Sequence, residues 1–333
     1  MSSITVATGS TDGQETKHGG EANNQLDQLS FRHVTGMKQN SEALARANTC
    51  DPRAVDAAAE IIANGIHKPL AEPIVFEYRE LWQHDRPMLD ELHAEAGHMP
   101  LDQLGGTYGW SVRYKQREDY VGLGVETLGD YIDAFRTGDK KLPYLRHISL
   151  NKSAPGLRRY IKDPVAFTPN WVTPRWLNRL GGPELFIGQE GTSFGHVHRD
   201  HANVHVGFVQ LEGEKELVLF PPSDRDYVYC CQGREFPYQD RATMVRYADL
   251  QNYDEFPLLR HATPHKITLR EGEALLMPAN WWHTTYNHCN SVSYSIRIIN
   301  ATNVAGSVGV HLAGIPRMIR RALFGRPQQP AQA

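Results

Sequence analysis

The residues that most clearly suggest chemistry are His198 and Asp200, which stand two positions apart in the segment GHVHRDHANVHV. Because alternate residues of a β-strand point to the same side, an imidazole and a carboxylate at this spacing would reach one point in space. A second imidazole would complete the set of two histidines and one carboxylate that holds Fe(II) on one face. His283, in the segment LLMPANWWH, is the candidate for it. The sequence therefore predicts a mononuclear metal site formed by His198, Asp200 and His283.

Two other metal motifs overlap the same segment. His196, His198, Asp200 and His201 satisfy the HxHxDH pattern of the metallo-β-lactamase superfamily. That motif should follow a hydrophobic strand early in its chain, whereas here it lies past the midpoint. His196 and His198 also match the HxH of metal-binding cupins, but no glutamate follows before Glu212. We therefore expect one metal ion, with His196 and His201 outside its ligand set.

Such a site needs a β-scaffold, and the second half of the chain supplies short β-rich runs. They are separated by turn signals such as Glu212-Gly213, Pro221-Pro222 and Glu271-Gly272. Many short strands with turns of this kind predict a sandwich or barrel, here a jelly roll. Strands are expected at residues 184–188, 204–210, 215–220, 265–269, 274–277 and 291–299.

The first half of the chain has a different composition. Residues 1–30 are small and polar, too poor in large apolar side chains to offset the entropy of ordering, so we expect disorder there. Thr127 is a candidate N-cap and Gly138 follows the expected end of the same helix. Helices are expected at residues 41–48, 52–66, 86–97 and 127–136, and strands at 73–76 and 142–150.

These elements suggest a division of the chain into five parts. The expected parts are a disordered segment 1–30, a helical and mixed part 31–138 packed on the core, a jelly-roll core 139–306, a C-terminal amphipathic helix 307–325 and a tail 326–333. The C-terminal helix is expected to dock on its own domain or to form a homodimer, rather than to anchor the chain in a membrane.

Composition excludes several classes of function. The 333 residues carry a formal net charge of −3, which argues against a nucleic-acid-binding protein. The four cysteines show no CxxC spacing, as expected for a reduced, cytoplasmic protein. The N-terminus lacks the basic and apolar regions of a secretory signal, and no apolar run reaches membrane-spanning length.

The motifs together resemble those of bacterial cupin-like proteins of the JmjC superfamily, relatives of the asparaginyl hydroxylase that inhibits hypoxia-inducible factor. The resemblance covers roughly residues 140–305, and two motifs in the right order are more specific than either alone. The matching residues are Gly191, Thr192, His198, Asp200, His205, Gln210, Gly213, Lys215, Pro221 and Pro222, then Gly272, Leu276, Pro278, Trp281, Trp282, His283, Ser291, Ser293, Ser295, Asn300 and Asn303.

The resemblance implies a double-stranded β-helix (jelly roll) of cupin/JmjC type with flanking helices. It also implies an oxygenase that uses Fe(II), 2-oxoglutarate and O2 and releases succinate and CO2. The expected reaction is hydroxylation of a protein, peptide or amino-acid side chain. Oxygenation of a small natural product and a non-catalytic metal-binding cupin are the alternatives.

The resemblance also implies which residues contact 2-oxoglutarate. Lys215 is expected to neutralise the distal carboxylate, because a buried lysine is costly without a partner. Relatives often have threonine where this chain has Gly195, so Thr192 or Ser193 is expected to replace it. Arg297 stands where asparagine is common, and could anchor a carboxylate or form a salt bridge with an acidic neighbour. Two further candidates for the pocket lining, equally well explained as polar packing, are Asn203 and His205.

Overall fold

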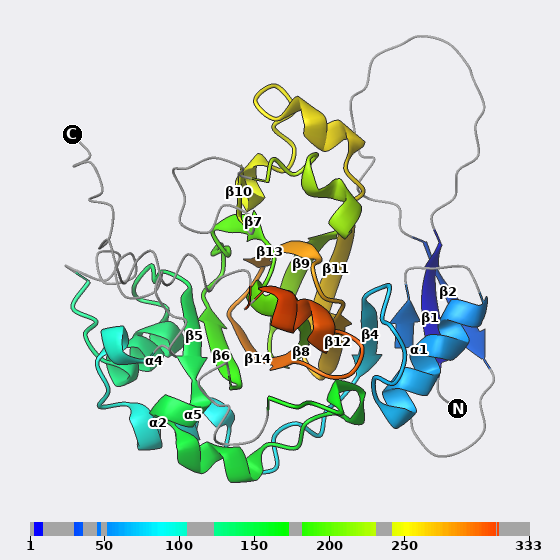
Figure 1. The fold of residues 1–333 in the computed structure, drawn as a ribbon. Helices are drawn as coiled ribbons and strands as arrows, with labels where there is room; N and C mark the ends of the chain where they lie inside the picture. Colours follow the sequence, from blue (N-terminus) through cyan, green and yellow to red (C-terminus); the bar gives the residue numbers. More distant parts are fainter. Residues whose placement is uncertain are drawn as a thin grey trace.

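Two β-sheets form the centre of the computed structural model, which describes residues 3–8, 30–35, 45–47, 52–104, 123–172, 182–230, 242–310 and 312 (Figure 1). The larger sheet has the strand order β2-β1-β3-β4-β12-β8-β14-β6-β5, and the smaller has the order β10-β7-β13-β9-β11. The strands are β1 (Ser3–Thr8), β2 (Ser30–Thr35), β3 (Ala45–Ala47), β4 (Ile74–Glu77), β5 (Leu145–Ser149), β6 (Glu184–Gly188), β7 (His196–His198), β8 (His205–Glu212), β9 (Glu214–Phe220), β10 (Ala242–Arg246), β11 (His265–Arg270), β12 (Glu273–Met277), β13 (Trp282–Asn287) and β14 (Ser291–Ile298).

Non-consecutive strands pair throughout these sheets, as in a jelly roll. β8 lies between β12 and β14, and β13 lies between β7 and β9. Apart from the pairing of β1 with β3, the ladders are antiparallel. The double-stranded β-helix expected from the sequence is confirmed.

The inner faces of the two sheets pack against each other. Leu217 and Leu219 of β9 are fully buried in one cluster with Phe208 of β8 and Leu275 of β12. Removing a large aliphatic side chain from water contributes about 1.5–3 kcal/mol, so this layer holds the sheets together. Strand alternation places Lys215 on the same inward face as Leu217 and Leu219.

The outer faces carry different coverings (Figure 1). Helices α1 (Pro52–Asn64), α2 (Met88–Ala96) and α4 (Leu128–Thr137) pack with the larger sheet in the largest hydrophobic cluster. The short helix α5 (Leu150–Ser153) follows β5. The outer face of the smaller sheet contributes Val218, Phe220 and Trp282 to a cluster that residues 228–230 and 245–259 complete.

Local signals explain where the best-formed helix begins and ends. The Thr127 side chain accepts a hydrogen bond from the backbone of Asp130, whose carboxylate bonds back to the Thr127 N–H. This is a capping box, which satisfies two backbone N–H groups at the helix start. Gly138 ends α4 in a left-handed conformation with φ of 67°. The cap and the stop predicted at these residues are confirmed.

Two segments differ from the sequence-based expectations. The helix predicted over residues 41–48 is wrong, because β3 (Ala45–Ala47) is a strand that pairs with β4 and β1. The unpaired edge of β4 offers backbone hydrogen bonds that outweigh the helical propensity of these alanines. Strand β1 lies within the segment expected to be disordered, where the β-branched sequence Ile4-Thr5-Val6 favours pairing with β2.

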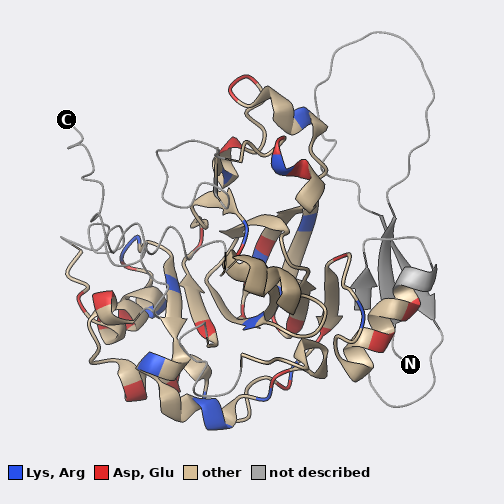
Figure 2. Ribbon diagram, in the orientation of Figure 1, with Lys and Arg blue, Asp and Glu red and all other residues tan. Residues whose placement is uncertain are grey.

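The C-terminal expectations fall mostly outside the described residues. Residues 304–310 are helical, and the remainder of the expected helix 307–325 and the tail 326–333 are not described apart from residue 312. Acidic and basic residues are interspersed along the ribbon in Figure 2. Among the residues that the structure describes, no helix combines the length and the apolarity needed to cross a membrane.

Candidate functional site

The fold brings His198 and His283 together on neighbouring strands. β7 and β13 are antiparallel, and these two histidines are register partners. Their imidazole centroids lie 4.2 Å apart. His283 is buried, and the ring of Phe194 stacks on His198 at 4.3 Å. The two imidazoles predicted to act together therefore do lie side by side.

Hydrogen bonds fix the tautomer of both rings. Nδ1 of His198 lies 3.1 Å from the carbonyl oxygen of His196, and Nδ1 of His283 lies 3.3 Å from that of Trp281. A carbonyl only accepts, so each Nδ1 donates and each Nε2 keeps its lone pair. Burial lowers the pKa of both histidines, and the proximity of His283 lowers that of His198 further. Two neutral imidazoles with available Nε2 atoms are suitable metal ligands.

Asp200 lies beside this pair, just after β7. Its Oδ2 atom is 3.8 Å from Nε2 of His283. That separation is too long for a hydrogen bond. Metal–ligand distances of about 2.0–2.2 Å place donors bound to one ion roughly 3–4 Å apart. Among the residues that the structure describes, no group of three or more His, Cys, Asp or Glu side chains is already placed so that it could hold a metal ion. The donor types fit a three-ligand site, and the Asp200–His283 separation suits one shared ion, but metal binding would have to draw the three donors together.

Arg297 of β14 contacts the other oxygen of Asp200, with Nε 3.7 Å from Oδ1. Its guanidinium also faces Glu184 of β6, with N–O distances of 3.2 and 3.3 Å. Burial opposes ionisation of Glu184, but Arg297 and His147 together lower its pKa to about 2. The structure thus favours the salt-bridge interpretation of Arg297 over a role as a cosubstrate anchor.

Lys215 is buried inside the jelly roll, with 2% of its surface exposed. Its ammonium donates hydrogen bonds to the Tyr144 hydroxyl at 2.7 Å and to Ser293 Oγ at 2.5 Å. None of its hydrogen-bond partners in the described chain is a carboxylate, and burial lowers its pKa to about 7. Lys215 is therefore not a solvent-exposed residue, although glutamates precede and follow it in the sequence. Burying an amine without a counter-ion is costly unless an anionic group pairs with it.

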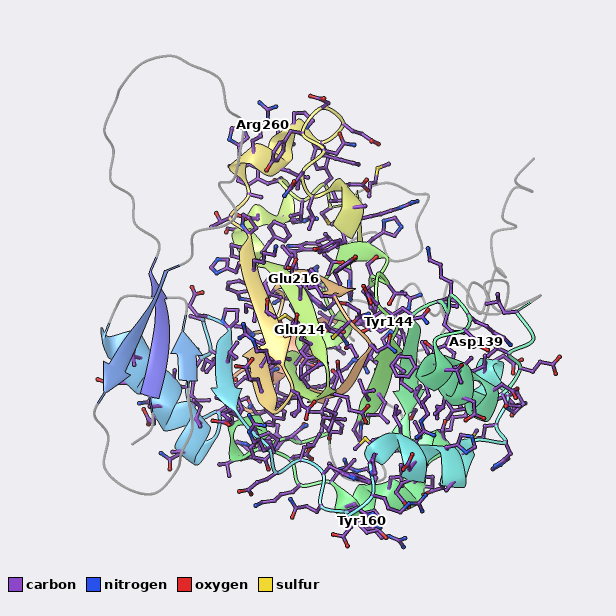
Figure 3. All side chains as sticks on the ribbon, turned by 180° about the vertical axis from the view of Figure 1, so that it is seen from behind. Asp139, Tyr144, Tyr160, Glu214, Glu216 and Arg260 are labelled. Atoms are coloured by element: carbon purple, nitrogen blue, oxygen red, sulfur yellow. The ribbon has the colours of Figure 1, made fainter. Side chains whose placement is uncertain are left out.

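The two glutamates that flank Lys215 on β9 point to the opposite face of the strand, because side chains alternate along it. Glu216 accepts hydrogen bonds from the Tyr247 hydroxyl at 2.7 Å and from Lys266 at 2.9 Å. Figure 3 marks the course of β9 by Glu214 and Glu216, and shows Tyr144 toward the green strands β5 and β6. Alternation along one strand therefore separates Lys215 from the carboxylates beside it in sequence.

Tyr144 is a site residue that the sequence did not reveal. It precedes β5, stands far from both motifs in the chain and is buried beside Phe186 and Phe194. Burial raises the pKa of its phenol, so it remains a neutral hydrogen-bonding group. The pairing of β5 with β6 places it in the larger sheet, and the facing of the two sheets brings it to Lys215 on β9. No local pattern in the sequence signals that contact.

The remaining candidate cosubstrate residues bond to the protein itself. The Thr192 hydroxyl donates to Gln189 O at 2.5 Å and accepts from Asn287 Nδ2 at 2.9 Å. Ser193 forms an isolated β-bridge with Tyr286. Thr192 is therefore explained by local structure, as the link between the loop after β6 and the end of β13.

Asn203 and His205 are likewise explained by polar packing. The Asn203 side chain bonds to Asn303 O at 3.0 Å and to the amide of Asn280. The Ala279 N–H donates to His205 Nδ1 at 3.1 Å, and His205 Nε2 donates to Thr302 Oγ1 at 2.9 Å. Burial lowers the pKa of His205 to about 4, which keeps this imidazole neutral.

The chain matches the family described as "Cupin-like domain" over residues 76–298. This match covers more than half of the chain, and with the two facing sheets it defines the class of protein. The chain belongs to the cupin-like family, and the JmjC-type resemblance stated from its motifs is confirmed.

Some relatives carry names that state a dependence on iron and 2-oxoglutarate. The chain is 25% identical over 179 residues to "2-oxoglutarate and iron-dependent oxygenase JMJD4" of Mus musculus, covering 53% of this chain and 40% of that protein. The Gallus gallus protein of the same name is 26% identical, over 49% of this chain and 37% of its own length. "HSPB1-associated protein 1" of Homo sapiens is 33% identical over 30% of this chain and 20% of its own. The chain thus spans less than half the length of these curated relatives.

Proposed function

We propose that this chain is an Fe(II)- and 2-oxoglutarate-dependent oxygenase. The observation that carries the proposal is the buried Lys215, which shares the interior of the jelly roll with His198, Asp200 and His283. A metal site alone gives no reason to bury a lysine amine on the next strand. A dicarboxylate that binds the metal at one end and the lysine at the other does. The similarity to relatives named as iron and 2-oxoglutarate oxygenases supports the same assignment.

The separation of the two ends suits this ligand. Ser293, which contacts Lys215, and Arg297, which contacts Asp200, are four residues apart on β14. Their backbones therefore lie about 13 Å apart along the strand. A five-carbon dicarboxylate, with one metal–oxygen and one ammonium–oxygen contact, spans roughly 10 Å. The two lengths are of the same order.

In this proposal each residue has a defined task. His198, Asp200 and His283 would hold the iron. Bound iron supplies the centre at which O2 and 2-oxoglutarate react. Lys215 and Tyr144 bind and orient the distal carboxylate. The other members of the interior layer, which exclude water around it, are Phe208, Leu217 and Leu219.

The reaction proposed is hydroxylation of a protein, peptide or amino-acid side chain. 2-Oxoglutarate loses CO2 and becomes succinate with one oxygen atom of O2, while the other oxygen atom replaces hydrogen with hydroxyl on the substrate. Mass spectrometry of a peptide pool incubated with the iron-loaded protein tests the substrate class. A gain of about 16 Da on peptides, absent in the Asp200→Ala variant, is expected. A gain on small metabolites alone would favour the natural-product alternative.

Succinate release tests the oxygenase proposal itself. The iron-loaded protein should convert 2-oxoglutarate to succinate, and the His283→Ala variant should not. A protein that binds iron but leaves 2-oxoglutarate unchanged, with and without the peptide pool, would instead be a non-catalytic metal-binding cupin.

A further inference from the structure

Asp200 lies on a segment that does not fix its own side chain. It follows β7 in an extended conformation, immediately before a short turn of 3-10 helix at residues 201–203. Two residues of that turn, Ala202 and Asn203, have φ angles of 69° and 54°. The Asp200 carboxylate makes no capping hydrogen bond to the turn. Its orientation must therefore come from groups on other strands.

The two oxygens of Asp200 face different partners. Oδ2 faces Nε2 of His283 at 3.8 Å, which is the side on which a metal would sit. Oδ1 faces Nε of Arg297 at 3.7 Å. An arginine on one oxygen leaves the other oxygen to act as a single metal donor. This arrangement favours a metal that is bound by one oxygen of Asp200 over a metal that is chelated by both oxygens.

Arg297 is itself fixed by a second carboxylate. Both terminal nitrogens of its guanidinium face Glu184, at 3.2 and 3.3 Å, which is the two-point geometry that holds an arginine in one orientation. Arg297 and Glu184 lie on the adjacent strands β14 and β6 of the larger sheet. The guanidinium thus reaches from that sheet to the carboxylate that follows β7 of the smaller one.

Glu184 has its own support in His147, whose Nδ1 lies 2.8 Å from Oε2. His147 has a φ of 60°, a conformation that is uncommon for residues with a side chain. It lies where the β5–β6 pairing shifts register, between Leu145 and Ile148. This irregularity turns the imidazole of His147 toward Glu184, and local strain of this kind clusters at functional sites.

We propose that Glu184, Arg297 and His147 form a positioning relay that orients Asp200 for binding the metal through one oxygen. The inference rests on the proposed function, because it assumes a metal held by His198, Asp200 and His283. Without the Glu184 charge, Arg297 is free to pair more closely with Asp200. The guanidinium then competes with the metal for the Asp200 carboxylate. Glu184 thus acts through Arg297 without touching the metal, and is a positioning residue.

The test compares Co(II) binding by calorimetry, and the visible spectrum of bound Co(II), in the wild type and in Glu184→Gln. Loss of a group that orients a ligand typically weakens metal affinity by about 10- to 100-fold, and the same loss is expected here with an altered spectrum. Arg297→Lys keeps the charge but loses the two-point contact, and should show a smaller shift in the same direction. It also serves as the second variant if Glu184→Gln fails to fold.

The control is Arg158→Gln, which removes another half-buried arginine ion pair. Arg158 lies 3.7 Å from Asp163 and bonds to Tyr294, on the opposite face of β14 from Arg297. The Arg158→Gln variant should have a changed melting temperature but should bind Co(II) with unchanged affinity and an unchanged spectrum. Unchanged Co(II) binding in both Glu184→Gln and Arg297→Lys would overturn the relay while leaving the metal site intact. A wild type that binds no Co(II) would overturn the metal site and the relay together.

Discussion

His198 and His283 are register partners on adjacent antiparallel strands, with their imidazole centroids 4.2 Å apart. A single ladder position therefore brings together two histidines that are 85 residues apart in the sequence. Each ring donates through Nδ1 to the carbonyl two residues before it. Because the strands fix both backbones, both Nε2 atoms are oriented before any metal arrives. Asp200, on the turn beyond β7, is the ligand that needs further support.

The first prediction concerns the three ligands. His198→Ala and Asp200→Ala should each abolish tight iron binding and turnover together, because two remaining donors are too few for an open site. Metal content after iron loading and desalting measures this, with His196→Ala as the matched control. Full iron content in both ligand variants would contradict the assignment of the site.

The second prediction concerns the distal carboxylate. Lys215→Ala should bind iron nearly normally but raise the Michaelis constant for 2-oxoglutarate by about 30- to 150-fold. This follows from the loss of a charge-assisted contact of about 2–3 kcal/mol. Lys266→Ala is the control, because Lys266 pairs with Glu216 on the outer face of the same sheet. Equal effects of the two substitutions would show that no carboxylate binds inside at Lys215.

The third prediction is that the protein takes up a proton when it binds 2-oxoglutarate. Burial lowers the pKa of Lys215 to about 7, and its neighbours Tyr144 and Ser293 are neutral. At pH 8 the free amine is mostly neutral, and a bound carboxylate raises its pKa so that it gains about one proton. Below pH 6 it is already charged, so uptake should vanish.

Calorimetry of the Mn(II)-loaded protein in buffers of different ionisation enthalpy measures this uptake. The Lys215→Met variant provides the control, since it has no amine to protonate. Uptake that is the same at pH 6 and pH 8, or that persists in Lys215→Met, would assign the proton to another group.

The fourth prediction separates this site from a binuclear hydrolase. His196, His198, Asp200 and His201 together match the HxHxDH pattern, and of these the structure places His198 and Asp200 beside His283. We expect one metal ion per chain and normal metal binding in His201→Ala. Elemental analysis that finds two zinc ions per chain, one of them lost in His201→Ala, would restore the hydrolase interpretation.

The local part of the site could be predicted from the sequence. One local signal is the two-residue spacing of His198 and Asp200, and another is the turn residues between the β-rich runs. Each depends on the sequence of a single strand and its ends. The inward direction of Lys215 came from the family resemblance, and alternation along β9 confirms it. The helix expected at residues 41–48 failed for a related reason, because alanine-rich propensity says nothing about a neighbouring strand edge.

The non-local part could not be predicted. Glu184 meets Arg297 because β6 and β14 are adjacent strands of the larger sheet. Tyr144, next to β5 of the larger sheet, meets Lys215 on β9 because the larger and smaller sheets face each other. The sequence left two interpretations open for Arg297, as a carboxylate anchor and as a salt bridge. Only the position of Glu184 on the neighbouring strand favours the second. The strand order decides such contacts, and no local pattern specifies it.

The most direct test of the oxygenase account is the fate of labelled dioxygen. The iron-loaded protein is incubated with 2-oxoglutarate, a peptide pool and ¹⁸O₂, and the succinate is examined by mass spectrometry. The account predicts succinate that carries one ¹⁸O atom, formed by the wild type and absent from His283→Ala. Unlabelled succinate, or 2-oxoglutarate that remains unchanged in the wild type, would contradict it.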